Sequence, residues 1–155
     1  MDARKISYII GGLMTLISTY FFTFHLYFPG LHFYGIGFIM NIPTFFTSGD
    51  ILDIIMAIVF IMFLLSGIFM LIGLKSRKLA IIGSSLCILG GVYFILVFYM
   101  GIFENSQFAF MFLNNELIEG IIPFYIPIGT VSLGPSFVLA GGLLSLFGGI
   151  NRTGW

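Results

Sequence analysis

The sequence predicts an all-α integral membrane protein with four transmembrane helices, and three observations lead to that prediction. Hydrophobic residues make up 59% of the 155 residues and charged residues only 8%, against roughly 25% charged in ordinary soluble domains. Four long apolar segments follow one another along the chain. If each crosses the bilayer once, all basic residues fall on one side. A chain of this length is expected to form one domain, residues 1–155.

The first predicted span covers residues 6–28, which is longer than the apolar core of a signal peptide, so we expect it to be retained. The second covers residues 51–74 and the third residues 79–103. Both exceed the roughly 20 residues that a helix needs to cross the hydrocarbon core. The fourth, Leu133–Ile150, is shorter and has Pro135 near its start, where the first helical turn tolerates proline.

The charged residues predict the orientation of these spans. The basic residues that would share one side are Arg4, Lys5, Lys75, Arg77, Lys78 and Arg152. The acidic residues that would lie on the other side are Asp50, Asp53, Glu104, Glu116 and Glu119. Lys and Arg are enriched in cytoplasmic loops. We therefore expect a multi-pass plasma-membrane protein in the lipid bilayer, with both termini in the cytoplasm.

The chain also carries the signs of an internal duplication. A shift of 72 residues brings the first span onto the third, so that Gly11 falls on Gly83. A shift of 75 brings the second onto the fourth, so that Gly67 falls on Gly142. This predicts a tandem repeat of two helical hairpins, residues 1–77 and 78–155, related by a pseudo-twofold axis along the membrane normal. Chance identity between glycine-rich apolar helices is the alternative.

Small side chains recur at helical spacing and predict the faces on which the helices pack. They are Gly11, Thr15 and Ser18 in the first span, Gly83, Cys87, Gly90 and Gly91 in the third, and Gly141, Ser145, Gly148 and Gly149 in the fourth. Residues three or four positions apart share one helical face. Small residues there let helix backbones approach closely in lipid. A binding groove along the same faces is the alternative.

Two segments expected outside the cytoplasm are long and apolar. We call residues 29–49 the first outer segment and residues 104–132 the second outer segment. Prolines interrupt both, so we expect them to lie in the outer interface rather than to cross the membrane as helices. Their aromatic residues are the candidate contacts to a partner: Phe33, Tyr34, Phe38, Phe45, Phe46, Phe108, Phe110, Phe112, Phe124 and Tyr125. The expected partners are other membrane protein subunits or a second copy of the chain.

Three ionisable residues are weak candidates for ligand binding. His25 and His32 could suggest haem or copper ligation, although a bis-histidine haem normally takes its ligands from different helices. Hydrogen bonding at the membrane interface is the favoured interpretation of both. Asp53 lies close to a predicted helix start, where the helix dipole favours an acid. We predict no metal and no cofactor, and leave haem or quinone open.

The topology resembles that of the claudin and peripheral-myelin-type four-helix proteins, which also have cytoplasmic ends, a short inner turn and two outer loops. The run 134–149, with paired glycines inside an aliphatic helix, is similar to their fourth helix. The tryptophan and paired cysteines of their first outer loop are absent, because the only tryptophan here is Trp155 and the only cysteine is Cys87. The resemblance therefore implies an architecture and carries no function.

Composition narrows the function further. The net charge is zero and no stripe of Lys and Arg exists, which excludes a nucleic-acid partner. A single cysteine excludes thiol-exchange membrane enzymes, which need a pair. Without a visible catalytic constellation, the sequence predicts a non-catalytic accessory or structural subunit of a larger membrane assembly. A small transporter or channel, using hydroxyls such as Thr15 and Ser18, is one alternative. A haem- or quinone-binding redox subunit is the other.

Overall fold

The computed structural model describes residues 2–102 and 107–150, and the chain is mostly helical. Glu104, Arg152 and the predicted end of the third span at residue 103 lie outside the described residues. The helices are α1 (Ala3–Phe21), α2 (Gly35–Thr47), α3 (Ile51–Leu64), α4 (Ser66–Ile72), α5 (Arg77–Tyr99) and α6 (Leu133–Ile150). The remaining elements are β1 (His25–Phe28), β2 (Leu31–Phe33), the 3₁₀ helix η1 (Ala109–Phe112), β3 (Leu113–Asn115), β4 (Pro127–Ile128) and β5 (Val131–Ser132).

Two of the described helices, α5 and α6, are long and apolar enough to cross a membrane. A third span is present if α3 and α4, whose axes differ by 42°, cross together as one bent helix. These candidate spans indicate a membrane location. Helix α6 begins at Leu133 and holds Pro135 in its first turn, so that prediction is confirmed.

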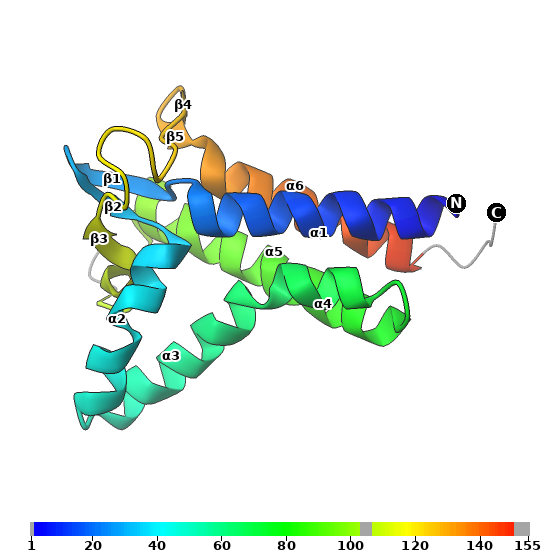
Figure 1. Cartoon of the computed structure of the whole chain (residues 1–155), viewed down its shortest axis with the longest axis horizontal. Helices are drawn as coiled ribbons and strands as arrows, with labels where there is room; N and C mark the ends of the chain where they lie inside the picture. Colours follow the sequence, from blue (N-terminus) through cyan, green and yellow to red (C-terminus); the bar gives the residue numbers. More distant parts are fainter. Residues whose placement is uncertain (1, 103–106, 151–155) are drawn as a thin grey trace.

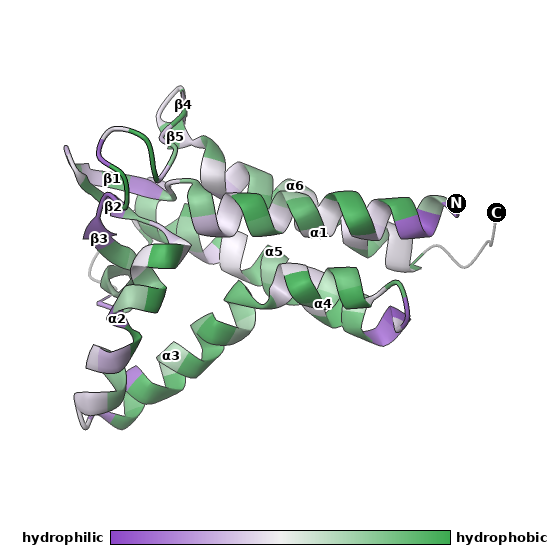
Figure 2. Ribbon diagram, viewed as in Figure 1, coloured by the Kyte–Doolittle hydropathy of each residue, from purple (hydrophilic) through white to green (hydrophobic). Residues whose placement is uncertain are grey.

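Helices α1, α4, α5 and α6 run side by side and form what we call the bundle (Figure 1). The start of α1, the α4–α5 turn and the end of α6 lie together at one end of it. We call this the basic end, because it carries Arg4, Lys5, Lys75, Arg77 and Lys78. Figure 2 shows hydrophilic residues there and in the strands at the opposite end, with hydrophobic residues along the helices between them.

The opposite end of the molecule is a layer that we call the cap, residues 24–47 and 108–115. Strands β1, β2 and β3 form one antiparallel sheet, in the order β1-β2-β3, so a strand from the second outer segment completes the sheet of the first. Helix α2 packs on η1 and β3 (Figure 1). The segment that follows the cap, residues 117–128, we call the rim.

The first span was predicted to continue to residue 28, and this is wrong, because α1 ends at Phe21. From there the backbone pairs with the outer segments. The amide of Thr23 donates to the carbonyl of Phe124 (3.0 Å), and the amide of Phe24 donates to that of Phe33 (2.7 Å). These aromatic and β-branched residues favour extended backbone, so residues 25–28 form a strand instead of the last turns of a helix.

The second span was predicted as one helix, residues 51–74, but it bends at Leu65. The carbonyl of Leu64, at the bend, accepts a hydrogen bond from the Tyr20 hydroxyl of α1 (3.0 Å). A bend loosens the regular carbonyl pairing of a helix, and away from water a side chain must supply the missing partner. Contact with α1 therefore stabilises the bend and sets the direction of α3.

The first outer segment was expected to be interrupted at Pro43, yet α2 runs through this residue. The Asn41 side chain donates to the carbonyls of Met111 (3.1 Å) and Leu113 (2.9 Å), which ties α2 to the second outer segment. At 13 residues, α2 is about 20 Å long, too short to cross a core of about 30 Å.

Candidate functional site

The small residues of the predicted packing faces lie at contacts between helices. A methyl group added to Gly11 of α1 would lie 2.6 Å from the Gly141 carbonyl oxygen of α6. One added to Gly83 of α5 would lie 2.6 Å from the Ser66 carbonyl oxygen of α4. Such distances are shorter than van der Waals contact, so only hydrogen fits at these two positions. The backbones themselves touch, as small residues allow in membrane helices.

The other glycines of these faces contact side chains of neighbouring helices. Gly91 faces Leu139 of α6, whereas Gly90, one residue earlier, faces the ring of Phe63 in α3. Gly148 and Gly149 lie against α1 and α5, respectively. The predicted faces are therefore divided among several partners.

Two of these contacts recur under the shifts that relate the predicted halves. Gly11 contacts residues 141 and 145. Gly83, which lies 72 residues after Gly11, contacts residues 66 and 70. These two residues lie 75 positions before 141 and 145, respectively. Gly67 meets Leu16, and Gly142 meets Ile88 in the same way. Thr15 and Cys87, also 72 residues apart, touch each other directly, with Oγ1 3.3 Å from Sγ.

The middle of the bundle is polar but uncharged. Cys87 Sγ donates to the carbonyl of Val138 (3.0 Å), and Ser18 Oγ donates to that of Met14 (2.6 Å). Among the described residues, the buried hydroxyls of Thr19 and Ser145 have no hydrogen-bond partner. The centre thus offers hydroxyl groups and one thiol, without an acid or a base among the contacts described.

The ten aromatic residues expected to contact a partner divide into three groups. Phe33, Tyr34, Phe38 and Phe112 are at most 2% exposed and lie in the chain's own core. Phe45 and Phe108 pack partly buried against that core. Phe46, Phe110, Phe124 and Tyr125 are 41–47% exposed. The first four rings are therefore covered by the chain itself; that of Phe112, for example, packs on Phe38 and Phe60 with centroids 4.8 Å apart in each pair.

His32 is the centre of a buried polar cluster that joins three segments. Its Nε2 lies 2.9 Å from Oε1 of Glu116, and its Nδ1 lies 3.0 Å from Oγ1 of Thr23. A carboxylate only accepts, so Nε2 carries a proton and donates it; in the neutral ring Nδ1 then accepts from the Thr23 hydroxyl. The amide of Gly120 donates to the other carboxylate oxygen (2.7 Å). The hydrogen bond from Gly120 makes the largest contribution to lowering the pKa of Glu116, and the hydrogen bond from His32 makes the next largest.

The order hydroxyl, imidazole, carboxylate is also that of a nucleophilic hydrolase site. Here the Thr23 side chain is fully buried, and its own carbonyl accepts a hydrogen bond from the Ser132 hydroxyl. A substrate cannot reach this hydroxyl in the observed fold. The cluster instead fixes the end of α1 to β2 and to the segment after β3. No sequence pattern connects Glu116 to His32, because 84 residues separate them.

His25 and His32 point to opposite faces of the sheet. His25 pairs with Phe33 and His32 with Leu26, and successive strand residues alternate between faces. The His25 ring stacks on Phe98, with centroids 4.9 Å apart and planes 10° apart, and burial lowers the pKa of His25. The two histidines therefore cannot bind one haem iron or copper ion together in this fold, which corrects that interpretation of the pair.

Asp53 lies in the first turn of α3, as the helix-dipole interpretation requires. The side-chain cap of this helix is Asp50, whose carboxylate accepts from the amide of Leu52 (2.8 Å). Both carboxylates line a shallow hollow beside Phe45 and Gln107. Among the described residues, no group of three or more His, Cys, Asp or Glu side chains is placed to hold a metal ion.

In comparisons with known proteins, no family model, curated protein or solved structure matches this chain.

Proposed function

We propose that the chain is a non-catalytic, four-span subunit of a larger membrane protein assembly, and that the rim contacts an apolar surface of a neighbouring subunit. The observation that carries the proposal is the exposure of large apolar side chains at the end of the molecule outside the spans. The exposed rim residues are Leu117, Ile118, Ile121, Phe124, Tyr125, Ile126 and Ile128. Contiguous exposed apolar patches mark interaction sites.

Helix α1 supports the assignment of four spans. Its exposed residues are Ile6, Ile10, Leu13, Ile17 and Phe21, and its buried residues are Tyr8, Gly11, Gly12, Thr15, Ser18 and Thr19. Aliphatic residues outward and small or hydroxyl residues inward are the reverse of a soluble helix, and suit a helix surrounded by lipid. Its 19 residues extend about 28 Å, close to the hydrocarbon thickness.

Charge supports both the orientation and the type of partner. The basic end would face the cytoplasm by the positive-inside rule. The described charged residues of the outer end are acidic: Asp50, Asp53, Glu116 and Glu119. A subunit with basic residues around an apolar surface would complement the rim and its surroundings.

Gly11 and Gly83 make equivalent contacts, as do Gly67 and Gly142, and this equivalence supports a tandem repeat of residues 1–77 and 78–155. In that arrangement α4 and α6 are equivalent, and Thr15 meets Cys87 close to the pseudo-twofold axis. A repeat of this kind suits both a structural subunit and a transporter.

A small transporter or channel is the second candidate, and one observation favours it. Two buried hydroxyls in the bundle, those of Thr19 and Ser145, have no hydrogen-bond partner in the described part of the chain. Polar groups of this kind inside a membrane domain mark solute or ion pathways in other proteins. The Ser145→Ala variant, assayed for solute flux in proteoliposomes, tests this candidate, which requires the flux to fall.

The test of the subunit proposal is the size of the protein extracted gently from its native membrane. We expect a complex much larger than the chain's 17.2 kDa plus detergent. The double variant Ile121→Ser, Ile128→Ser should release the single chain, because the two most exposed isoleucines of the rim lose their apolar contacts. The matched control is Ile39→Ser with Met40→Ser, two residues that are comparably exposed on α2.

The control variant should keep the complex intact. A wild-type chain that migrates alone, or a rim variant that leaves the complex unchanged, would overturn the proposal. Release by the control alone would move the interface to α2. A complex made only of this chain would identify the neighbouring subunit as a second copy.

A further inference from the structure

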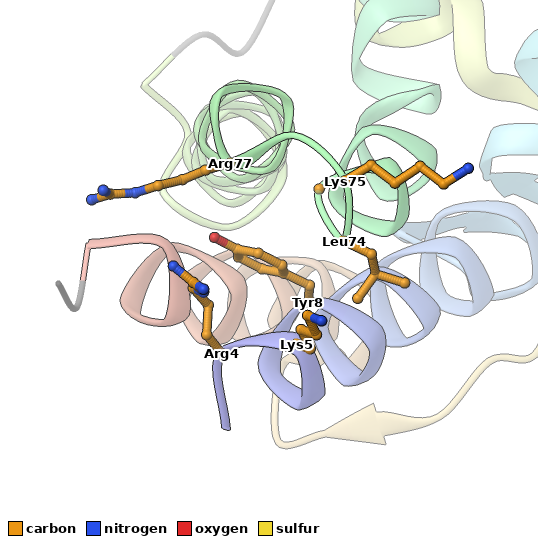
Figure 3. A pocket seen from close by; sticks show the side chains of 7 residues that line it. Arg4, Lys5, Tyr8, Leu74, Lys75 and Arg77 are labelled. Atoms are coloured by element: carbon orange, nitrogen blue, oxygen red, sulfur yellow. The ribbon is translucent and has the colours of Figure 1, made fainter. Parts of the chain in front are cut away.

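The basic end of the bundle contains a cavity of about 180 Å³ that the proposed function does not use. It is lined by Arg4, Lys5, Tyr8, Gly73, Leu74, Lys75 and Arg77. Four of these residues are cationic, and they come from the start of α1, the α4–α5 turn and the start of α5 (Figure 3). At roughly 30 Å³ per molecule of liquid water, the cavity holds about six waters, or one compact polar group.

Tyr8 makes this cavity more than a collection of surface charges. Its side chain is 1% exposed, and its hydroxyl has no hydrogen-bond partner among the described residues. Figure 3 shows the ring reaching from α1 towards α5, with its hydroxyl between the Arg4 side chain and the point on α5 from which the Arg77 side chain extends outward. A buried hydroxyl without a partner destabilises the fold, and nearly all such groups in native proteins are paired. Within the described part of the chain, the Tyr8 hydroxyl is therefore available to donate a hydrogen bond to a ligand.

The two arginines that line the cavity with Tyr8 each make a contact within the chain and still have N–H groups outside that contact. Arg77 Nε donates to the carbonyl of Gly149 at the end of α6 (2.7 Å), which leaves its two terminal nitrogens outside that bond. Arg4 pairs with Asp2 (3.1 Å), the acidic residue of this end in the described part of the chain. A ligand would share Arg4 with that carboxylate, and the cationic groups still outnumber it. Guanidinium groups present planar sets of donors that match phosphate oxygens.

We propose that this cavity binds a phosphate group, with the Tyr8 hydroxyl and the Arg4 and Arg77 guanidinium groups as donors to its oxygens. The group belongs either to the headgroup of an anionic lipid or to a soluble phosphate. A headgroup fits the position at the end of the bundle, because basic cavities between membrane helices on the cytoplasmic side bind such groups. The positive-inside rule explains basic residues at this end, but it does not explain a buried phenol without a partner beside them.

The experiment measures binding to the full chain in mild detergent by native mass spectrometry and by the shift in melting temperature. The probes are phosphatidic acid, phosphatidylcholine and inorganic phosphate. Phosphatidic acid should bind and raise the melting temperature, whereas phosphatidylcholine should bind at least about tenfold more weakly, because its choline group offsets the phosphate charge. Competition by inorganic phosphate would identify the soluble form as the ligand, and lack of competition would identify the lipid.

Two variants and one control separate the cavity from general surface charge. Tyr8→Phe removes one oxygen and should weaken phosphatidic acid binding about threefold or more. Without ligand its melting temperature should equal or exceed that of the wild type, because the unpaired hydroxyl is gone. Arg77→Gln should weaken binding about tenfold. The control Lys78→Gln removes the same charge one residue later, from an exposed side chain outside the cavity, and should change binding less than about twofold.

Equal weakening by Lys78→Gln and Arg77→Gln, or unchanged binding by Tyr8→Phe, would overturn the proposal in favour of general attraction to a basic surface. Equal binding of phosphatidylcholine and phosphatidic acid would overturn it as well. None of these measurements involves the rim, which lies at the other end of the molecule, so this inference and the proposed subunit role can fail separately.

Discussion

The bundle and the cap each have a buried interior, but different kinds of contact hold the two regions together. In the bundle, glycines bring backbones together, as at Gly11 and Gly141, and single side-chain contacts such as Thr15 with Cys87 link the helices. In the cap, large rings such as Phe38 and Phe112 stack, and backbone ladders join segments distant in sequence. Lipid is as apolar as a side chain, so helices within it associate through close fit. Irregular backbone outside the helices must instead pair its polar groups.

Tyr99, the last residue of α5, connects the two regions. Its hydroxyl donates to the carbonyl of Phe24 (2.5 Å) and accepts from the amide of Ser132 (3.0 Å). The position of the cap is therefore fixed to the end of a candidate span and to the start of α6. The bundle should therefore respond most to changes in side-chain volume, and the cap to the loss of rings and hydrogen bonds. The following substitutions test that difference.

The largest effect is expected for Gly11→Leu in the bundle. Even a methyl group would lie 2.6 Å from the Gly141 carbonyl, so α1 and α6 must separate, at a cost of about 3 kcal/mol or more. Thermal unfolding in detergent measures the change. The control is Ile10→Leu, at a neighbouring residue that is 50% exposed on the outer face of α1. Equal melting temperatures for the two variants would show that the helices do not touch there.

Phe112→Ala should destabilise the cap by about 3–5 kcal/mol, the usual loss for a fully buried phenylalanine. Hydrogen exchange should show lost protection in β2 and α2, with protection retained in α5 and α6. The control, Phe110→Ala, removes a ring that is 47% exposed two residues earlier and should have a much smaller effect. Loss of protection throughout the molecule would instead mean that cap and bundle unfold as one unit.

His32→Ala should destabilise the cap by about 1–3 kcal/mol, because the buried Thr23 hydroxyl loses its partner. His25→Phe should have little effect, since a phenyl ring can keep the stacking on Phe98. Unfolding measured in parallel for both variants gives the comparison. A larger loss for His25→Phe would mean that stacking, rather than the Thr23–His32–Glu116 cluster, holds the sheet in place.

The smallest effect is expected from pH. Folding lowers the pKa of Glu116, so its contribution to stability is present above the ordinary glutamate value of 4.5. That contribution is lost as the pH falls from there through the lowered pKa of the folded state. The melting temperature of the wild type should therefore fall more steeply below this value than that of Glu116→Gln. Identical pH profiles for the two proteins would contradict the role of this carboxylate.

Features that depend on local sequence could be predicted, and features that depend on distant pairing could not. The run of apolar residues up to Ile150 and the position of Pro135 were enough to place α6. The end of α1 at Phe21 depends on Phe124 and Phe33, residues that no local pattern connects to it. The prediction from the sequence therefore placed the end of the first span too late in the chain.

The bend of the second span and the His32 cluster were missed for the same reason. Leu65 is not itself a helix breaker, although the Ser66-Gly67 pair beside it is a type of sequence at which helices kink. The hydroxyl that supports the bend comes from Tyr20, 44 residues before Leu64. The helix faces of glycine and hydroxyl residues were visible because their spacing is a property of one helix. Which helix each face meets was not, as the different partners of Gly90 and Gly91 illustrate.

The register of β2 with β3 determines when the protein can finish folding during its synthesis. His32 pairs with Asn114, so β2 has its second edge open while the next 82 residues are added. At about 5–20 residues per second this takes about 4–16 s, far longer than the microseconds in which a hairpin such as β1–β2 forms. In the proposed orientation, the first outer segment therefore crosses the membrane while one edge of β2 is still unpaired. That edge stays open until residues 113–115 arrive to pair with it.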